Sequence, residues 1–285
     1  TGMEIGEILV IASGCTDNTV QIAQQLRRED DRLTVIEEAE RHGKAHAVNI
    51  ALRCAKREII VLIPGDVVPE QTAVAELCRT LLNDPRVGVV CGMPCPTNDD
   101  GTVADRIAIL LWRLHNRTLK VLSREKLATH ACGELMAIRK DVIPSVDEDV
   151  VNEDAFIGVY AWRRGYQVAF NEAARVLMKA PNSVPEIVRQ RTRALYGHHM
   201  VKRRLGYFPR TLGCMIFYDL KRTLKILQAE ISDNAAVLPE MMLLIFLELL
   251  AHSLIIVSSL RKIDYSKWSP IESTKAVFVQ DQVRR

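Results

Sequence analysis

The sequence predicts an α/β fold in which helices flank a mostly parallel sheet, followed by one apolar helix near residue 250. Two observations support this class. Apolar runs of strand length alternate with amphipathic segments of helix length through the first 200 residues, as in a parallel sheet covered by helices. The run at residues 59–63 is continuously apolar, which is typical of a strand buried on both faces.

The first half of the chain alternates regularly. The expected elements are a strand at 7–12, a helix after a cap at Thr16 or Asp17, a strand at 33–36, a helix after Gly43, a strand at 58–63, a helix starting at Pro69 and a strand at 87–91. Thr and Asp side chains accept hydrogen bonds from the free N–H groups of a first helical turn. Proline suits a helix start because its missing N–H would have no partner there.

The second half is less regular. The expected elements are a helix at 103–123, a strand from Ala131 to Ile138, a helix from Glu153 to Gly165, short strands at 166–170 and 174–178, and a helix from about Val184. The helix at Glu153 opens on two adjacent carboxylates and ends at a glycine. Acidic residues suit the positive end of a helix, and glycine suits its C-terminal cap.

Composition narrows the classes of partner. The net charge is only +3, so bulk charge gives no indication of nucleic-acid binding. The seven cysteines are odd in number and scattered, which favours buried thiols in a reducing compartment. Cys91 and Cys95 have no second pair to complete four zinc ligands. The histidines show no spacing typical of a metal site, and we expect them to be surface or satisfied core residues.

Residues 237–260 are mostly apolar, with Glu240, Glu248 and His252 as interruptions. A helix of about 20 residues matches the roughly 30 Å hydrocarbon thickness of a bilayer. One Glu near its centre disfavours insertion by about 2–3 kcal/mol, less than the apolar residues contribute. We expect a membrane-embedded or transmembrane helix. The alternatives are a helix buried against the catalytic domain or one lying in the membrane interface.

Five motifs follow one another along the chain. They are Ser13-Gly14-Cys15-Thr16-Asp17-Asn18-Thr19, Gly43-Lys44-Ala45, Gly65-Asp66, Asn152-Glu153-Asp154 and Gln190-Arg191-Thr192-Arg193. In this order and approximate spacing, from about residue 7 to about residue 200, the chain resembles the inverting family 2 glycosyltransferases of GT-A fold, related to membrane polysaccharide and glycolipid synthases. The resemblance implies a Rossmann-like sheet. It also implies transfer of a sugar from a nucleotide sugar, most commonly UDP-linked, to a hydroxyl of a glycan or lipid-linked acceptor.

The resemblance also implies the catalytic roles. Asp154 would be the general base that takes the proton from the acceptor hydroxyl, and Glu153 would support it. Asp66 would touch a Mg²⁺ or Mn²⁺ ion, because a cation shared with a diphosphate needs only one or two protein carboxylates. The alternatives are that Asp66 is an ordinary turn residue and that the acidic pair only caps a helix.

Five further residues receive binding roles from the resemblance. Lys44, Gln190 and Arg193 would bind the donor and its diphosphate, since a guanidinium matches phosphate geometry. Gly133 and Glu134 fall where the acceptor-side loop of the family lies. The alternative for the stretch around Arg193 is a solvated basic face that meets anionic lipid.

The chain departs from the family pattern at three places. Pro64 stands where the first Asp of an Asp-x-Asp motif is usual, which implies weaker or altered metal binding. Ala194 replaces the Trp of the Gln-x-x-Arg-Trp signature, so an aromatic platform for the acceptor sugar is missing there. Ala12 and Ser13 replace two acidic residues at the nucleotide end. Family members also have a strand and helix before the first strand seen here, so we expect that N-terminal unit to be missing.

Two other function classes stay open. A nucleotidyltransferase would have a related sheet but needs a glycine-rich basic loop after its first strand, and none is visible. A degenerate nucleotide-sugar-binding or scaffold protein would explain the lost motif residues. The expected organisation is a catalytic domain at 1–200, an amphipathic, basic connection at 201–236, the membrane helix at 237–260 and a polar tail at 261–285. We expect the protein at a membrane, with the catalytic domain in the cytoplasm.

Overall fold

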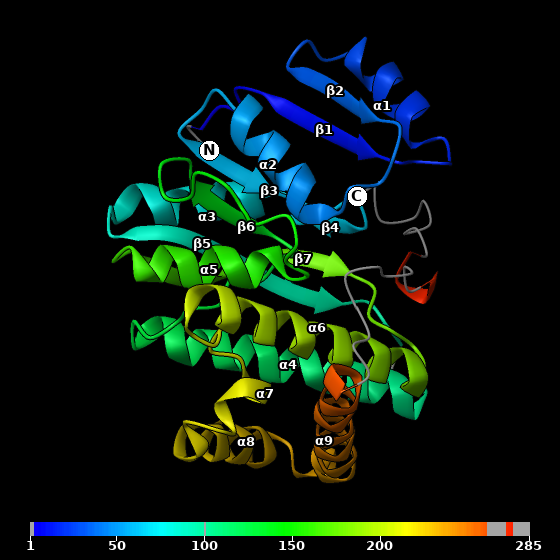
Figure 1. The fold of residues 1–285 in the computed structure, drawn as a ribbon, viewed down its shortest axis with the longest axis vertical. Helices are drawn as coiled ribbons and strands as arrows, with labels where there is room; N and C mark the ends of the chain where they lie inside the picture. The colour runs from blue at the N-terminus through cyan, green and yellow to red at the C-terminus, as the bar shows by residue number, and fades with distance from the viewer. Residues whose placement is uncertain (1–2, 100, 261–271, 276–285) are drawn as a thin grey trace.

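The computed structural model describes residues 3–99, 101–260 and 272–275, so most of the tail expected at 261–285 lies outside the described residues (Figure 1). The elements in chain order are β1 (Ile8–Ser13), α1 (Thr19–Arg27), β2 (Leu33–Glu38), α2 (Lys44–Cys54), β3 (Ile59–Leu62), β4 (Val67–Pro69), α3 (Ala73–Asn83), β5 (Val87–Pro96), α4 (Val103–Arg124), β6 (Met136–Arg139), α5 (Glu153–Arg163), β7 (Gln167–Met178), α6 (Val184–Leu205), α7 (Leu212–Met215), α8 (Leu220–Asp233), η1 (Ala235–Val237), α9 (Leu238–Leu260) and η2 (Glu272–Lys275). Helix α6 crosses the domain boundary expected at residue 200, and the division into domains stays a prediction.

The strands form two sheets. β1 and β2 pair in parallel, and the other five lie in the order β3-β6-β5-β7-β4. Within the larger sheet β5 and β7 are parallel, whereas β3–β6, β5–β6 and β4–β7 are antiparallel. The α/β class is as predicted, but strand direction is more mixed than the mostly parallel sheet expected. Alternation of strands and helices does not fix direction where a long loop, such as residues 125–135, lets the chain turn before it re-enters the sheet.

Three local predictions need correction. Pro69 ends strand β4 instead of starting a helix, and α3 begins at Ala73. Proline is tolerated there because β4 is an edge strand that pairs only with β7 in the described sheet. The strand expected from Ala131 covers only Met136–Arg139. The two short strands expected around Asn171 are one strand, β7, whose pairing with β5 shifts register between Cys91 and Met93.

The helices pack in layers against the larger sheet. Fully buried apolar side chains from α3, α4, β6 and α5 fill the core, among them Leu77, Ile107, Leu114, Ile138 and Ile157. Thr102 caps α4, since its side-chain oxygen accepts a hydrogen bond from Asp105 N. Figure 1 shows α4 and α6 running together on the side of α5 away from the sheet, with α7, α8 and α9 forming the lowest layer.

Helix α9 is apolar on both sides: Leu244, Leu247 and Ala251 are buried against the domain, and other apolar side chains are exposed on its outer side. Its packed face puts Glu248 and His252 toward the domain, where the imidazole Nε2 of His252 lies 3.1 Å from the carbonyl oxygen of Gly213. Large side chains on the outer face, such as Met242 and Phe246, are about 60% exposed. Among the described residues, Ala235–Val257 is the one helical segment long and apolar enough to cross a membrane, by length and composition.

Candidate active site

The acidic pair opens helix α5, as the sequence predicts. The carboxylate of Asp154 accepts hydrogen bonds from the backbone N–H groups of Gly133 (3.2 Å) and Ala155 (2.6 Å). Burial raises the pKa of Asp154 above its usual value of 3.8, and the charges of Lys44 and Arg193 act against that increase. A carboxylate whose pKa is raised toward the working pH is a better proton acceptor than an exposed one.

Lys44 neutralises the other member of the pair. Gly43 adopts φ 95°, which glycine tolerates, and lets α2 begin at Lys44. The ammonium of Lys44 lies 2.6 Å from Glu153 Oε1 and donates to the carbonyl oxygen of Gly133 at 3.5 Å. Desolvation disfavours the charged ammonium, but the carboxylates of Glu153 and Asp154 outweigh it and raise the pKa of Lys44. The lysine therefore stays charged beside the acidic pair.

Helix α6 meets the start of α5 at a tight contact. The side-chain amide of Asn152 donates to the carbonyl oxygen of Ala194 at 2.9 Å. A Cβ on Gly197 would lie 2.5 Å from the same side chain, so only glycine allows this approach. Arg193 follows on this face of α6, and its guanidinium donates to the Val151 carbonyl oxygen at 3.4 Å. Desolvation lowers the pKa of Arg193, while Glu153 and Asp154 favour its charged form.

One cavity of about 290 Å³ collects most of the residues chosen from the sequence. Its lining includes seven of the eight, namely Lys44, Gly133, Glu134, Glu153, Asp154, Gln190 and Arg193. The cavity continues between α4, α6, α8 and α9, where apolar side chains line it. A carboxylate pair, a lysine and an arginine therefore share one end of a mostly apolar chamber.

Asp66 is the residue that this cavity does not include. It lies half-buried in the turn between β3 and β4. Among the described residues, no group of three His, Cys, Asp or Glu side chains is placed to hold a metal ion. One carboxylate fits a divalent cation only when donor phosphates and water supply the other ligands.

The loop before β6 buries a second carboxylic acid. Burial raises the pKa of Glu134, and the thiol of Cys132 donates a hydrogen bond to Glu134 Oε2 at 2.8 Å. Burial and Glu134 together raise the pKa of the Cys132 thiol. Burial therefore favours the neutral thiol of Cys132 over the thiolate.

The expected nucleotide end forms a local turn before α1 in the described structure. Asp17 Oδ1 accepts hydrogen bonds from the backbone N and the hydroxyl of Thr19, at 3.0 and 2.5 Å. The N-cap of α1 is Asn18, which makes no side-chain capping hydrogen bond, so the cap expected at Thr16 or Asp17 is one or two residues too early.

Sequence reasoning missed the polar residues deeper in the cavity. Trp112 and His115 lie on α4, His130 in the following loop and His198 on α6, and all four line the cavity. The i, i+3 spacing of Trp112 and His115 is the one signal that could have joined two of them. The ion pair of Arg191 with Glu248, at 2.7 and 2.8 Å, was also missed.

Comparisons with known proteins identify the family of this chain. The family model described as "Glycosyltransferase like family 2" matches residues 5–197. The poly-beta-1,6-N-acetyl-D-glucosamine synthase of Staphylococcus aureus (strain COL) is 24% identical over 198 residues, which are 68% of this chain and 48% of that protein. The synthase of the same name from Staphylococcus epidermidis gives the same values. The chain spans about half the length of these curated relatives.

A solved structure is similar in fold. The mannosyltransferase PcManGT from Pyrobaculum calidifontis, in complex with GDP-Man and Mn²⁺, has a TM-score of 0.58 and 22% identity, covering 89% of this chain and 74% of that one. This similarity confirms the expected GT-A-type α/β fold. Because the family model matches residues 5–197, which are more than half of the sequence, the chain belongs to glycosyltransferase-like family 2.

Proposed function

We propose that this chain is an inverting glycosyltransferase that moves a sugar from a UDP-linked nucleotide sugar to a hydroxyl of a glycan or lipid-linked acceptor.

 The observation that carries the proposal is the Asp154 carboxylate, held by two backbone N–H groups and with a raised pKa, at the end of a cavity that it shares with Lys44 and Arg193. The proposal is supported by the family membership and by the names of the relatives, one a polysaccharide synthase and the other a mannosyltransferase.

The proposed reaction is a single displacement. The acceptor hydroxyl oxygen attacks the anomeric carbon, and the bond from that carbon to the diphosphate oxygen breaks. The electron pair of the broken bond leaves with the diphosphate, and the hydroxyl proton passes to Asp154. Lys44 and Arg193 stabilise the negative charge that develops on the leaving group, and Glu153 holds Lys44 in position.

A divalent cation is part of the proposal. Mg²⁺ or Mn²⁺ would be held by Asp66 together with the donor phosphates, and it would neutralise charge on the diphosphate. The mannosyltransferase with the similar fold was solved with Mn²⁺. Asp66→Asn is expected to weaken donor binding in the presence of the cation and to leave binding without it unchanged.

Transfer from a defined donor panel tests the function. The full chain is incubated with UDP-glucose, UDP-N-acetylglucosamine and GDP-mannose, with Mg²⁺ or Mn²⁺, and release of the nucleotide diphosphate is measured with and without acceptor. Asp154→Asn should retain donor affinity and lower the turnover by about 10²–10⁴-fold, the usual contribution of a general base. Turnover of Asp154→Asn at the wild-type rate would overturn the base assignment. Donor binding without turnover in the wild type would favour the binding-protein alternative.

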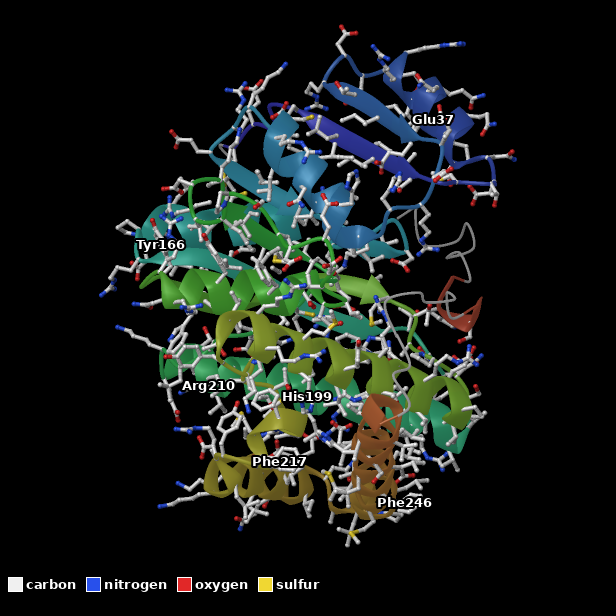
Figure 2. The ribbon with its side chains drawn as sticks, viewed as in Figure 1. Glu37, Tyr166, His199, Arg210, Phe217 and Phe246 are labelled. Atoms are coloured by element: carbon white, nitrogen blue, oxygen red, sulfur yellow. The ribbon has the colours of Figure 1, made fainter. Side chains whose placement is uncertain are left out.

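We also propose that α9 attaches the catalytic domain to the cytoplasmic face of a membrane. Figure 2 shows Phe217 beside α7 and α8 and Phe246 on α9, both in the lowest layer. Phe217, Leu224 and Phe246 are each more than 50% exposed, and soluble monomers rarely expose apolar patches of this kind. Because the other face of α9 packs against α4 and α6, an interfacial position suits this helix better than a membrane-spanning one.

Vesicle binding tests the attachment. The double variant Met242→Glu/Phe246→Glu changes only the outer face, because both side chains are about 60% exposed. It should lose most co-sedimentation with anionic lipid vesicles. Leu82→Glu is the matched control, since Leu82 is 59% exposed on α3. Equal co-sedimentation of the double variant and the wild type would contradict attachment through α9.

A further inference from the structure

A row of aromatic side chains carries buried polar atoms that have no hydrogen-bond partner among the described residues. The ring centroids of Trp112 and His115 are 5.2 Å apart, and those of His115 and His130 are 5.5 Å apart. Trp112 Nε1, His115 Nε2 and His130 Nδ1 are buried, and none of them has a hydrogen-bond partner in the part of the chain that the structure describes. Such atoms are rare in folded proteins, because leaving them unpaired is destabilising. All three side chains line the cavity that contains Asp154, so they are placed to bind a ligand there.

The row is electrically neutral. Burial, with the charge of Arg191 adding to its effect, lowers the pKa of His130 to about 4, and burial lowers the pKa of His115 well below 6.5. Each neutral imidazole has one donor and one acceptor, and the indole has one donor. The guanidinium of Arg191 is held by both carboxylate oxygens of Glu248. The neutral donors and acceptors of this row suit a neutral ligand with several hydroxyls.

The same cavity has an apolar side formed by α8 and α9. Leu227, Met241 and Leu244 line it, together with Ile245 and Leu249. Ile245 and Leu249 are also 38% and 53% exposed, so this side of the cavity reaches the outer face of α9. With a volume of about 290 Å³, the cavity is at the low end of the range for small-molecule sites. It suits one sugar ring with the start of an apolar chain better than a run of sugar rings.

We propose that the cavity binds the acceptor as a neutral sugar with an apolar aglycone. The sugar hydroxyls would bond to Trp112, His115 and His130, and the apolar chain would leave between α8 and α9. This inference rests on the proposed function and narrows its acceptor to a glycolipid. The cavity also offers an aromatic surface to the sugar. Ala194 stands where the family signature has Trp, and Trp112 reaches the same cavity from another helix.

Direct binding tests this subsite without requiring transfer. The full chain in lipid nanodiscs is titrated calorimetrically with octyl glucoside below its micelle concentration, with octanol and with free glucose, using empty nanodiscs as the blank. Octyl glucoside should bind at least about tenfold more tightly than either of the other two, a difference of about 1.4 kcal/mol. Equal binding of octanol, or no binding of octyl glucoside, would overturn the proposal.

Two variants test the named side chains. Trp112→Phe keeps an aromatic ring and removes the N–H donor, so the affinity for octyl glucoside should fall roughly threefold to tenfold. The KM for octyl glucoside as acceptor should rise by the same factor while the KM for the donor stays unchanged. His130→Phe should act in the same direction and gives a second test if Trp112→Phe misfolds. Trp162→Phe is the control, because Trp162 packs on Tyr207 and does not line the cavity.

The possible results of these experiments distinguish a failure of the acceptor subsite from a failure of the proposed function. Unchanged affinity in both Trp112→Phe and His130→Phe would mean that water alone satisfies these buried atoms, and the subsite would be wrong. Binding of octyl glucoside with no transfer from any nucleotide sugar would support the subsite and contradict the proposed function. Transfer to free oligosaccharides without any binding of octyl glucoside would support the function and contradict the subsite.

Discussion

The ion pair between Arg191 and Glu248 gives a sharp prediction about stability. Arg191 lies on α6 between two residues of the candidate site, and Glu248 lies in the middle of the apolar helix α9. Two hydrogen bonds of 2.8 and 2.7 Å join them in a bidentate arrangement. Each side chain is only 15% exposed, so Glu248→Gln would leave the guanidinium charge in a largely water-free position.

The expected loss follows from that burial. Removing one member of a buried ion pair is destabilising by about 3–5 kcal/mol, whereas replacing both members by apolar residues is often neutral. Because some solvent reaches both side chains, we expect the lower end, about 3 kcal/mol, for Glu248→Gln. For a chain of this size that corresponds to a decrease in Tm of roughly 6–12 °C. The double variant Arg191→Met/Glu248→Leu should unfold within about 1 kcal/mol of the wild type.

Thermal unfolding followed by circular dichroism in one mild detergent measures these changes. Glu70→Gln is a useful control, because Glu70 pairs with Arg175 at 2.8 Å and both side chains are more than 40% exposed. Its Tm should change little, as for other exposed ion pairs. The reasoning would be refuted if Glu248→Gln melted with the wild type, or if the double variant were less stable than the single one.

Three further predictions concern the acidic pair and its support. Asp154 must be ionised to accept a proton, so transfer should fall as pH decreases through its pKa, which burial raises above 3.8; a pH–rate profile with its acid limb at or below 3.8 would contradict this. Lys44→Met removes a positive charge that lowers the pKa of Asp154, so the acid limb should move to higher pH. A move to lower pH would contradict this effect of Lys44 on the pKa of Asp154. Gly158→Ala should be destabilising by about 1–3 kcal/mol, because a Cβ there would lie 2.8 Å from the Thr129 carbonyl oxygen. Denaturant unfolding measures the free energy of unfolding of this variant and of the control Gly101→Ala, where a Cβ meets nothing within 4 Å. Equal stability of the two variants would contradict the steric argument.

Local signals predicted the elements that carry the acidic pair. Two carboxylates followed by a glycine mark the start and end of α5 within about 12 residues, and the structure begins α5 at Glu153. Helix α4, predicted at 103–123, is observed at Val103–Arg124 because its apolar residues recur at helical spacing. These features depend on neighbours in the sequence, which is why periodicity and capping reveal them.

Periodicity and capping could not predict contacts between segments that are distant in the sequence. Lys44 meets Glu153 across more than 100 residues, and the positions of Trp112, His115 and His130 in one cavity depend on how α4 packs against α6. Pro69 shows a different limit. Its missing N–H suits both a helix start and an edge strand, so the sequence could not choose between them until the pairing with β7 was known.

The contact between Asn152 and Gly197 bears on how natural sequence variants of this chain are interpreted. Gly197 does not line the cavity, yet any larger side chain there would push on Asn152, which lies next to the acidic pair. A ranking of variants by distance from the cavity would therefore class Gly197 as harmless. The residue instead sets the spacing between Asp154 on α5 and Arg193 on α6, and under the proposed function substitutions there should reduce turnover while the composition of the cavity wall stays the same.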